Sequence, residues 1–273
     1  MAVVALLGLW AVWWEPTRLY NQDHVLRLPS WPPACDRLRV AVLADIHTGS
    51  PHHDLAKLDE VINLTLAAQP DLVLLAGDYV ITGVVGGHVT PPEAIAGRLA
   101  RLSAPLGVYA VLGNHDHWFD APRVRAALEA QHIPVLEDRS TVLERGECRF
   151  WLAGISDFRT APADFNKALA DVPAHQPVVA FTHNPDLFPE MPARVTLTIA
   201  GHTHGGQVYL PGIGRPIVPS LYGDRYAAGH IVEGGRHLFV STGLGTSILP
   251  VRFLVPPEVS VLVLRPEGER HAE

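Results

Sequence analysis

Short apolar runs alternate with helical patterns along most of this chain. One run, Asp71-Leu-Val-Leu-Leu-Ala, follows Gln69-Pro70 and ends abruptly at Gly77-Asp78. A run this short and this uniformly apolar predicts a strand covered on both faces, as in the middle of an α/β sheet. Similar runs cover residues 38–44, 107–112, 177–182 and 195–200.

Helical patterns separate several of these runs. Residues 54–67 carry apolar side chains at helical spacing, and Asp54 is the candidate N-cap. Further helices are expected over residues 92–102, 122–131 and 163–170, and short strands between Gly/Pro turns over residues 207–264. This order predicts an α/β fold with two packed mixed β-sheets flanked by helices. We expect an apolar segment and linker over residues 1–37 and one domain over residues 38–266.

Residues 2–14 are continuously apolar and are followed by Glu15-Pro16. As a helix they cover about 20 Å, which is shorter than the roughly 30 Å hydrocarbon core of a bilayer. The segment also contains three tryptophans, which suit a membrane interface. We expect it to associate the protein with a membrane surface, and a buried core helix is the alternative. Residues 15–37, rich in Pro and Trp, predict an extended linker or an edge strand.

Composition excludes few classes of function. The 273 residues carry a net charge of −7 and no Lys/Arg-rich run, so we expect no nucleic-acid binding. The two cysteines, Cys35 and Cys148, form no metal-type pair. They would form a disulfide in an oxidising compartment only if the fold brings them together. The 15 histidines are more informative, because several lie beside glycines where apolar runs end.

Five apolar runs end in side chains that bind first-row divalent metals. These are Asp45 and His47, then Asp78, Asn114 and His115, His183, and finally His202 and His204. In an extended segment, residues i and i+2 point to the same side, so Asp45 with His47 and His202 with His204 can each approach one cluster. Asp78 stands alone, as expected of a carboxylate that bridges two ions. Two such ions stabilise the attacking and leaving oxygens in phosphoryl transfer.

In these motifs the chain resembles the calcineurin-like metallophosphoesterases, whose motifs read D-x-H, G-D, G-N-H-[DE], H and G-H-x-H. Here they stand in order over residues 45–204, as Asp45-Ile46-His47, Gly77-Asp78, Gly113-Asn114-His115-Asp116, His183 and Gly201-His202-Thr203-His204. The resemblance implies a four-layer α/β/β/α sandwich, with the catalytic domain over residues 38–266.

The resemblance also implies two divalent ions, of Mn, Fe or Zn. One ion would be bound by Asp45, His47, Asp78 and His204, and the other by Asp78, Asn114, His183 and His202. His115 is implied to contact the phosphate and to protonate the leaving oxygen. A hydroxide bridging the metals would attack phosphorus in line, without a covalent enzyme intermediate.

Some positions depart from the protein-phosphatase motif G-D-x-V-D-R-G. The sequence runs Gly77-Asp78-Tyr79-Val80-Ile81-Thr82-Gly83, without the second Asp and the Arg. This argues against phosphoprotein substrates and leaves His115 without its usual acidic partner, a role open to Asp116 or another acid. Residues 205–211 and 243–247 are similar to a bacterial subgroup of YkuE/YaeI type. That similarity implies a phosphodiester or pyrophosphate substrate, small or lipid-linked, such as UDP-2,3-diacylglucosamine.

A non-catalytic binding or scaffold protein with the same fold is the competing hypothesis. Such a protein is expected to have lost a ligand or His115, whereas this chain retains all of them. Other polar residues have simpler interpretations. We expect His52, His53 and His88 at the surface, and Arg225 as a solvated loop charge or a phosphate contact. Trp118 either lines the substrate pocket or simply packs against its neighbours.

Overall fold

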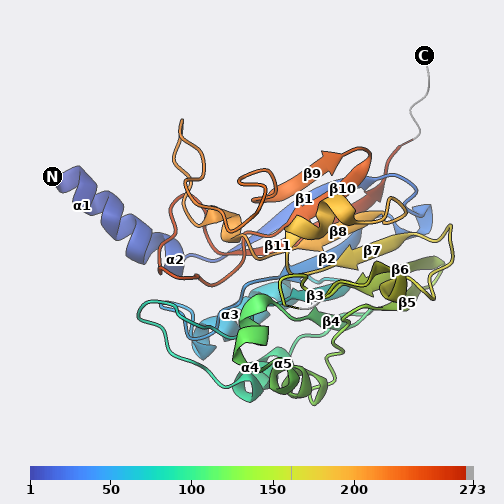
Figure 1. Cartoon of the computed structure of the whole chain (residues 1–273), viewed down its shortest axis with the longest axis horizontal. Coiled ribbons are helices and arrows are strands. Elements are labelled where there is room, and N and C mark those ends of the chain that lie inside the picture. The colour runs from blue at the N-terminus through green and yellow to red at the C-terminus, as the bar shows by residue number, and fades with distance from the viewer. Residues whose placement is uncertain (161, 269–273) are drawn as a thin grey trace.

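The computed structural model describes residues 1–160 and 162–268, which form two mixed β-sheets packed face to face (Figure 1). The first sheet contains, in spatial order, β1 (Tyr20–Leu28), β11 (Glu258–Pro266), β2 (Leu38–Leu43), β3 (Leu72–Ala76) and β4 (Val108–Val111). Strand β11 pairs antiparallel with β2, and the other neighbours in this sheet are parallel. β2 and β3 are parallel, and apart from Arg39 of β2 both are apolar because they are covered on both faces.

The second sheet contains β5 (Arg139–Arg145), β6 (Cys148–Gly154), β7 (Val178–Phe181), β8 (Leu197–Ala200), β10 (Arg236–Val240) and β9 (Gly229–Glu233). Its four central strands are parallel and its two outer pairs are antiparallel. β7 and β8 therefore end at the same edge of this sheet.

Three apolar cores separate four layers. One core fills the space between the sheets, with side chains such as Leu74 of β3 and Phe181 of β7. A second core lies between the first sheet and three helices, α3 (Leu55–Ala67), α4 (Pro92–Leu99) and α5 (Asn114–Glu129). A third core covers the outer face of the second sheet, beneath α6 (Phe165–Ala168) and the 3₁₀ helix η3 (Pro185–Glu190). The predicted α/β/β/α sandwich is confirmed.

Two local expectations need refinement. Helix α5 contains the expected helix from Pro122, but it begins earlier, at Asn114, with a kink at Asp120 between the two parts. Gly113 caps the earlier start, and Asp116 accepts a hydrogen bond from the backbone of Gly113. Of the two alternatives for residues 15–37, the structure has an edge strand, since β1 pairs with β11 along its whole length.

The N-terminus is helical through α1 (Ala2–Leu9), a π-helical turn η1 (Trp10–Trp14) and α2 (Glu15–Thr17). In Figure 1 it projects from one end of the molecule. We expected residues 2–14 to associate with a membrane, and this expectation is wrong. Within the described residues, no helix is long and apolar enough to cross a membrane. The segment instead contacts the domain, where the carbonyl of Ala11 accepts a hydrogen bond from the backbone of Arg252 at 2.9 Å.

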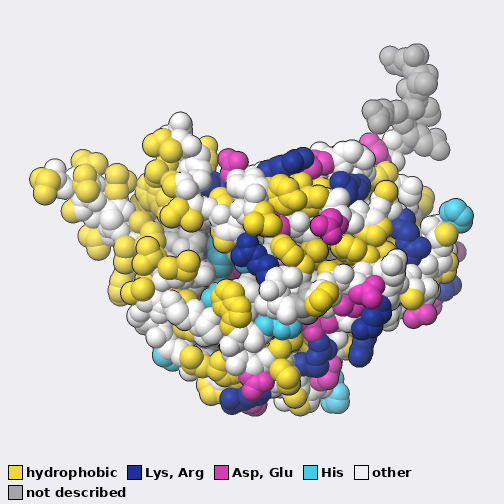
Figure 2. Space-filling view, viewed as in Figure 1, with side chains coloured by type: hydrophobic (Ala, Val, Ile, Leu, Met, Phe, Trp, Pro, Cys, Tyr) yellow, Lys and Arg dark blue, Asp and Glu magenta, His cyan; other side chains and the backbone are white. Residues whose placement is uncertain are grey.

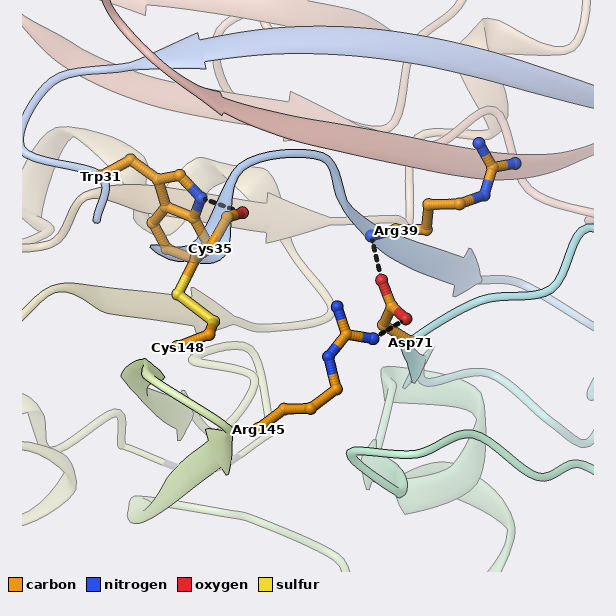
Figure 3. The surroundings of a disulfide bond; sticks show 6 residues. All are labelled: Trp31, Cys35, Arg39, Asp71, Arg145 and Cys148. Carbon is orange, nitrogen blue, oxygen red and sulfur yellow. Dashed lines mark hydrogen bonds and ion pairs between the residues drawn. A yellow bond between two sulfur atoms is a disulfide. The ribbon is translucent and has the colours of Figure 1, made fainter. Parts of the chain in front are cut away.

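Cys35 and Cys148 form a disulfide (Figure 3). Cys35 ends the short 3₁₀ helix η2 (Pro33–Cys35), which precedes the first sheet's β2, and Cys148 begins β6 of the second sheet. Nearby, Asp71 accepts a hydrogen bond from the backbone of Arg39 at 2.9 Å and pairs with Arg145 at the end of β5. Both connections link the two sheets at the edge where β2, β3 and β6 begin.

Candidate metal centre

The motif residues meet at the opposite edge, where the parallel strands end. Asp45 and His47 follow β2, Asp78 follows β3, His183 follows β7, and His202 and His204 follow β8. Asn114 and His115 form the first turn of α5 after β4. All eight side chains are buried. The packing of the two sheets therefore brings together every site residue that the sequence predicted.

The first group of ligand-type atoms surrounds His204. Its Nε2 lies 3.2 Å from Nε2 of His47 and 3.4 Å from Oδ1 of Asp45. Nε2 of His47 in turn lies 3.5 Å from Oδ2 of Asp78. Such separations suit side chains that converge on a single ion.

The second group surrounds His183. Its Nε2 lies 3.1 Å from Oδ1 of Asn114, 3.1 Å from Nδ1 of His202 and 3.2 Å from Oδ2 of Asp78. The same oxygen of Asp78 thus belongs to both groups. A carboxylate in this position can bridge two cations.

Backbone carbonyls determine which ring nitrogens face the centre. Nδ1 of His47 lies 3.2 Å from the carbonyl of Val80, and Nδ1 of His183 lies 2.8 Å from the carbonyl of Ala76. Because a carbonyl only accepts, each Nδ1 carries a proton, and each ring presents a lone pair on Nε2 when it is neutral. Lone pairs 3.1–3.2 Å apart repel one another unless a cation or a proton lies between them. The donor set therefore fits a divalent metal.

The electrostatics of the centre favour added positive charge. Burial raises the pKa of Asp45 to about 7. Burial also opposes a charge on His183, but the neighbouring carboxylates of Asp78 and Asp45 raise its pKa to about 10. By contrast, burial lowers the pKa values of His47 and His202 to about 3, so both rings are neutral near pH 7.

The backbone at the centre is unusual. Five residues adopt positive φ angles between 44° and 71°, a region that non-glycine residues rarely occupy; they are Asp45, His47, Asp78, His202 and His204. Strain of this kind persists where the surrounding structure enforces it and is concentrated at functional sites. Gly113 is required by close approach, because a Cβ there would lie 2.2 Å from Oδ1 of Asp78.

His115 lies beside both groups. Its ring is 4.6 Å from the ring of His47, and its backbone N–H donates to Oδ1 of Asp78 at 2.8 Å. Its Nδ1 contacts Thr82, with the hydroxyl at 2.8 Å and the backbone N–H at 3.2 Å. The exposed ring of Trp118 lies 5.0 Å from the ring of His115, at the surface beside the site.

Asp116 takes a different role from the one left open by the sequence. Its carboxylate accepts hydrogen bonds from the backbone of Asp78, Tyr79 and Gly113 at 2.8–2.9 Å. It therefore holds the loop after β3 against α5. At His115, Thr82 takes the place of the acidic partner that the protein-phosphatase motif supplies. Thr82 directly follows Ile81, which stands at the position of the missing Asp.

Several residues were not found from the sequence. The buried guanidinium of Arg252 donates to the carbonyls of Thr242, Gly245 and Val255 and so shapes the loop beside Asp45 and His47. No local pattern marks this arginine. His53 is buried, contrary to expectation, and its backbone pairs with Gly49 and Ser50. Arg225 is exposed and pairs with Glu233, so it is the solvated loop charge.

Comparison with known proteins agrees with this geometry. The profile of the calcineurin-like phosphoesterase family matches residues 38–206. An uncharacterized metallophosphoesterase of Bacillus subtilis, YkuE, is 28% identical over 92% of this chain and 87% of its own. The Escherichia coli phosphodiesterase YaeI is 31% identical over 83% of this chain and 82% of its own.

A solved structure of a candidate 5′-nucleotidase from Staphylococcus aureus, in complex with α-ketoglutarate, has the same fold. It superposes with a TM-score of 0.51 and 12% identity, over 86% of this chain and 55% of that one. The chain belongs to the calcineurin-like phosphoesterase family of metal-dependent phosphoester hydrolases.

Proposed function

We propose that the chain is a phosphodiesterase or pyrophosphatase that uses two divalent ions, with Asp78 as a ligand that both ions would share. One ion would be held by Asp45, His47, Asp78 and His204, and the other by Asp78, Asn114, His183 and His202. The position of Oδ2 of Asp78, 3.5 Å from Nε2 of His47 and 3.2 Å from Nε2 of His183, carries the proposal. The imidazole, amide and carboxylate donors suit Mn, Fe or Zn.

Bound divalent ions supply a nucleophile by lowering the pKa of water, and they polarise the phosphoryl group. The side chains of the protein set the net charge of the site and supply the proton. Asp45 and Asp78 cancel only part of the charge of two ions, so an anionic phosphate is still attracted into the buried site. His115 stands beside both groups, where its Nε2 can donate a hydrogen bond to a phosphate oxygen and, once the ring has taken up a second proton, transfer a proton to the leaving oxygen.

The substrate class follows from what surrounds the centre. Ile81 and Thr82 occupy the places of the Asp and Arg of protein phosphatases. The Escherichia coli relative is named a phosphodiesterase. We therefore propose cleavage of small or lipid-linked phosphodiesters or pyrophosphates, UDP-2,3-diacylglucosamine among them, in preference to phosphoproteins.

Metal analysis together with diester assays tests this proposal. The purified protein should hold two ions, and Asp78→Asn should lose at least one of them together with turnover of bis(p-nitrophenyl) phosphate. Asp36→Asn is the matched control, because Asp36 precedes β2, at the end of that strand opposite to Asp45, and forms a surface ion pair with Arg265. A single ion that Asp78→Asn leaves bound, or a preference for phosphopeptides over diesters, would refute it.

A further inference from the structure

Two adjoining cavities open beside His204. The inner one has a volume of about 100 Å³ and is lined in part by Thr203 and His204. The outer one has a volume of about 270 Å³ and extends the first toward the surface. Both are lined by Gly206, Gln207, Ile217, Ser247 and Ile248. Together they form one groove that leads outward from a proposed metal ligand.

The walls of this groove are apolar. The outer part is completed by Val208, Pro216, Leu249 and Val251. Its one amide side chain, Gln207, is used within the wall: Oε1 accepts from the backbone of Ser247 at 2.6 Å, and Nε2 donates to the carbonyl of Leu249 at 3.1 Å. A ligand in the outer part therefore meets mainly hydrocarbon.

The apolar side chains of the groove are presented to solvent. Ile217 is 78% exposed, Ile248 is 69% exposed and Leu249 is 54% exposed. Figure 2 shows hydrophobic side chains gathered at the end of the molecule that carries α1 and the neighbouring loops. A contiguous apolar patch beside a reaction centre is typical of a ligand-binding groove, unlike scattered exposed residues.

The backbone under the groove is constrained as well. Ile248 has φ of 61°, which is a true outlier for a β-branched residue. Its carbonyl accepts a hydrogen bond from the backbone of Val85 at 2.9 Å, in the loop that also carries Thr82. The groove wall is thus tied to the loop that contacts His115. A strained residue held in this way is expected where function requires the conformation.

We infer that this groove binds the apolar substituent, an alkyl or acyl chain, of a phosphodiester whose phosphate lies at the metal centre. The inference rests on the proposed function. It follows from adjacency: His204, whose Nε2 faces His47 at the metal centre, also lines the inner cavity, so a chain esterified to a phosphate at the centre has an apolar cavity beside it, and the outer groove extends that cavity. Each methylene that the groove buries adds binding free energy.

A homologous series of p-nitrophenyl alkyl phosphodiesters, from methyl to octyl, tests the inference with the metal-loaded full chain. We expect kcat/KM to rise with chain length by up to about fourfold for each methylene buried. Ile248→Asn removes the apolar side chain and retains a residue that tolerates positive φ. This variant, and separately Ile217→Ser on the facing segment, should reduce the octyl-to-methyl ratio of kcat/KM at least tenfold.

Val232→Ser is the control, because Val232 is an exposed valine on β9 outside the groove lining; its ratio should match that of the unaltered protein. An octyl-to-methyl ratio of kcat/KM near one in the unaltered protein, with all diesters hydrolysed, would refute chain binding in the groove. The proposed function would remain intact. Hydrolysis of no diester would instead defeat the proposed function. A flat series together with concentration-dependent dimers, abolished by Ile248→Asn, would assign the groove to a second copy of this chain.

Discussion

The hydroxyl of Thr82 lies 2.8 Å from Nδ1 of His115, and the backbone N–H of Thr82 donates to the same nitrogen at 3.2 Å. Because a backbone N–H can only donate, Nδ1 must accept, and neutral His115 carries its proton on Nε2. The usual acidic partner would favour a protonated ring, whereas this arrangement favours the neutral one. Burial acts in the same direction and lowers the pKa of His115.

Replacing Thr82 by Val should impair chemistry without emptying the site, because the hydroxyl of Thr82 orients the ring of His115. Loss of one hydrogen bond, worth about 1 kcal/mol, should lower kcat by about five- to tenfold. The loss should be larger for an alkoxide leaving group than for p-nitrophenolate, since only the former needs a proton. Thr82→Ser should restore most of the rate. Equal losses for both leaving groups, or no rescue by Ser, would reduce Thr82 to a packing residue.

His115→Ala should lower kcat by about 10²–10⁴ while the metal content stays unchanged. The reason is that the proposed role of His115 lies in the transition state and not in holding a metal. Activity assays paired with metal analysis of the same preparation measure both quantities. Loss of metal in this variant would place His115 among the ligands, which its proximity to His47 and Asp78 allows.

Metal affinity should rise with pH between about 6 and 8. In the metal-free protein, burial raises the pKa of Asp45 to about 7, and the adjacent carboxylates raise that of His183 to about 10 against the effect of burial. At pH 6 both groups hold protons that an incoming cation must displace. At pH 8 Asp45 is already ionised, so fewer protons are released. His47 and His202, with pKa values of about 3, contribute nothing in this range.

Calorimetric titration with Mn²⁺ in two buffers of different ionisation enthalpy measures the protons released at each pH. The expected number is larger at pH 6 than at pH 8. Asp45→Asn, which cannot be protonated, should remove most of that difference. An affinity that is independent of pH over this range would contradict the assignment of both groups to the centre.

Removing the Cys35–Cys148 disulfide should lower the free energy of unfolding by about 2–5 kcal/mol, because the bond closes a long loop in the unfolded chain. Urea unfolding of the double variant Cys35→Ala/Cys148→Ala measures the loss. The metal content of this variant should be unchanged, because the disulfide lies at the edge of the sheets opposite the metal centre. Reductant should destabilise the unaltered protein and leave the double variant unaffected. Equal unfolding midpoints for oxidised and reduced protein would show that the bond adds no stability.

The sequence by itself determined the strands that carry the site and the residue types that end them. Uniformly apolar runs such as Leu72–Ala76 are recognisable because a strand buried on both faces has no polar alternation. The carboxyl ends of parallel strands in one sheet lie at one edge, so Asp45 and Asp78 were expected together from local pattern alone.

Only the tertiary structure decided the contacts between distant segments. Thr82 reaches His115 because the loop after β3 folds over the start of α5, and no spacing rule joins residues 33 positions apart. Cys35 meets Cys148 across 113 residues, because the two sheets stack with their edges aligned. The groove beside His204 forms where Gln207 is hydrogen-bonded to the segment around Ser247. Hydrophobic pattern specifies which face of an element is buried, but the packing of two sheets specifies which loops meet.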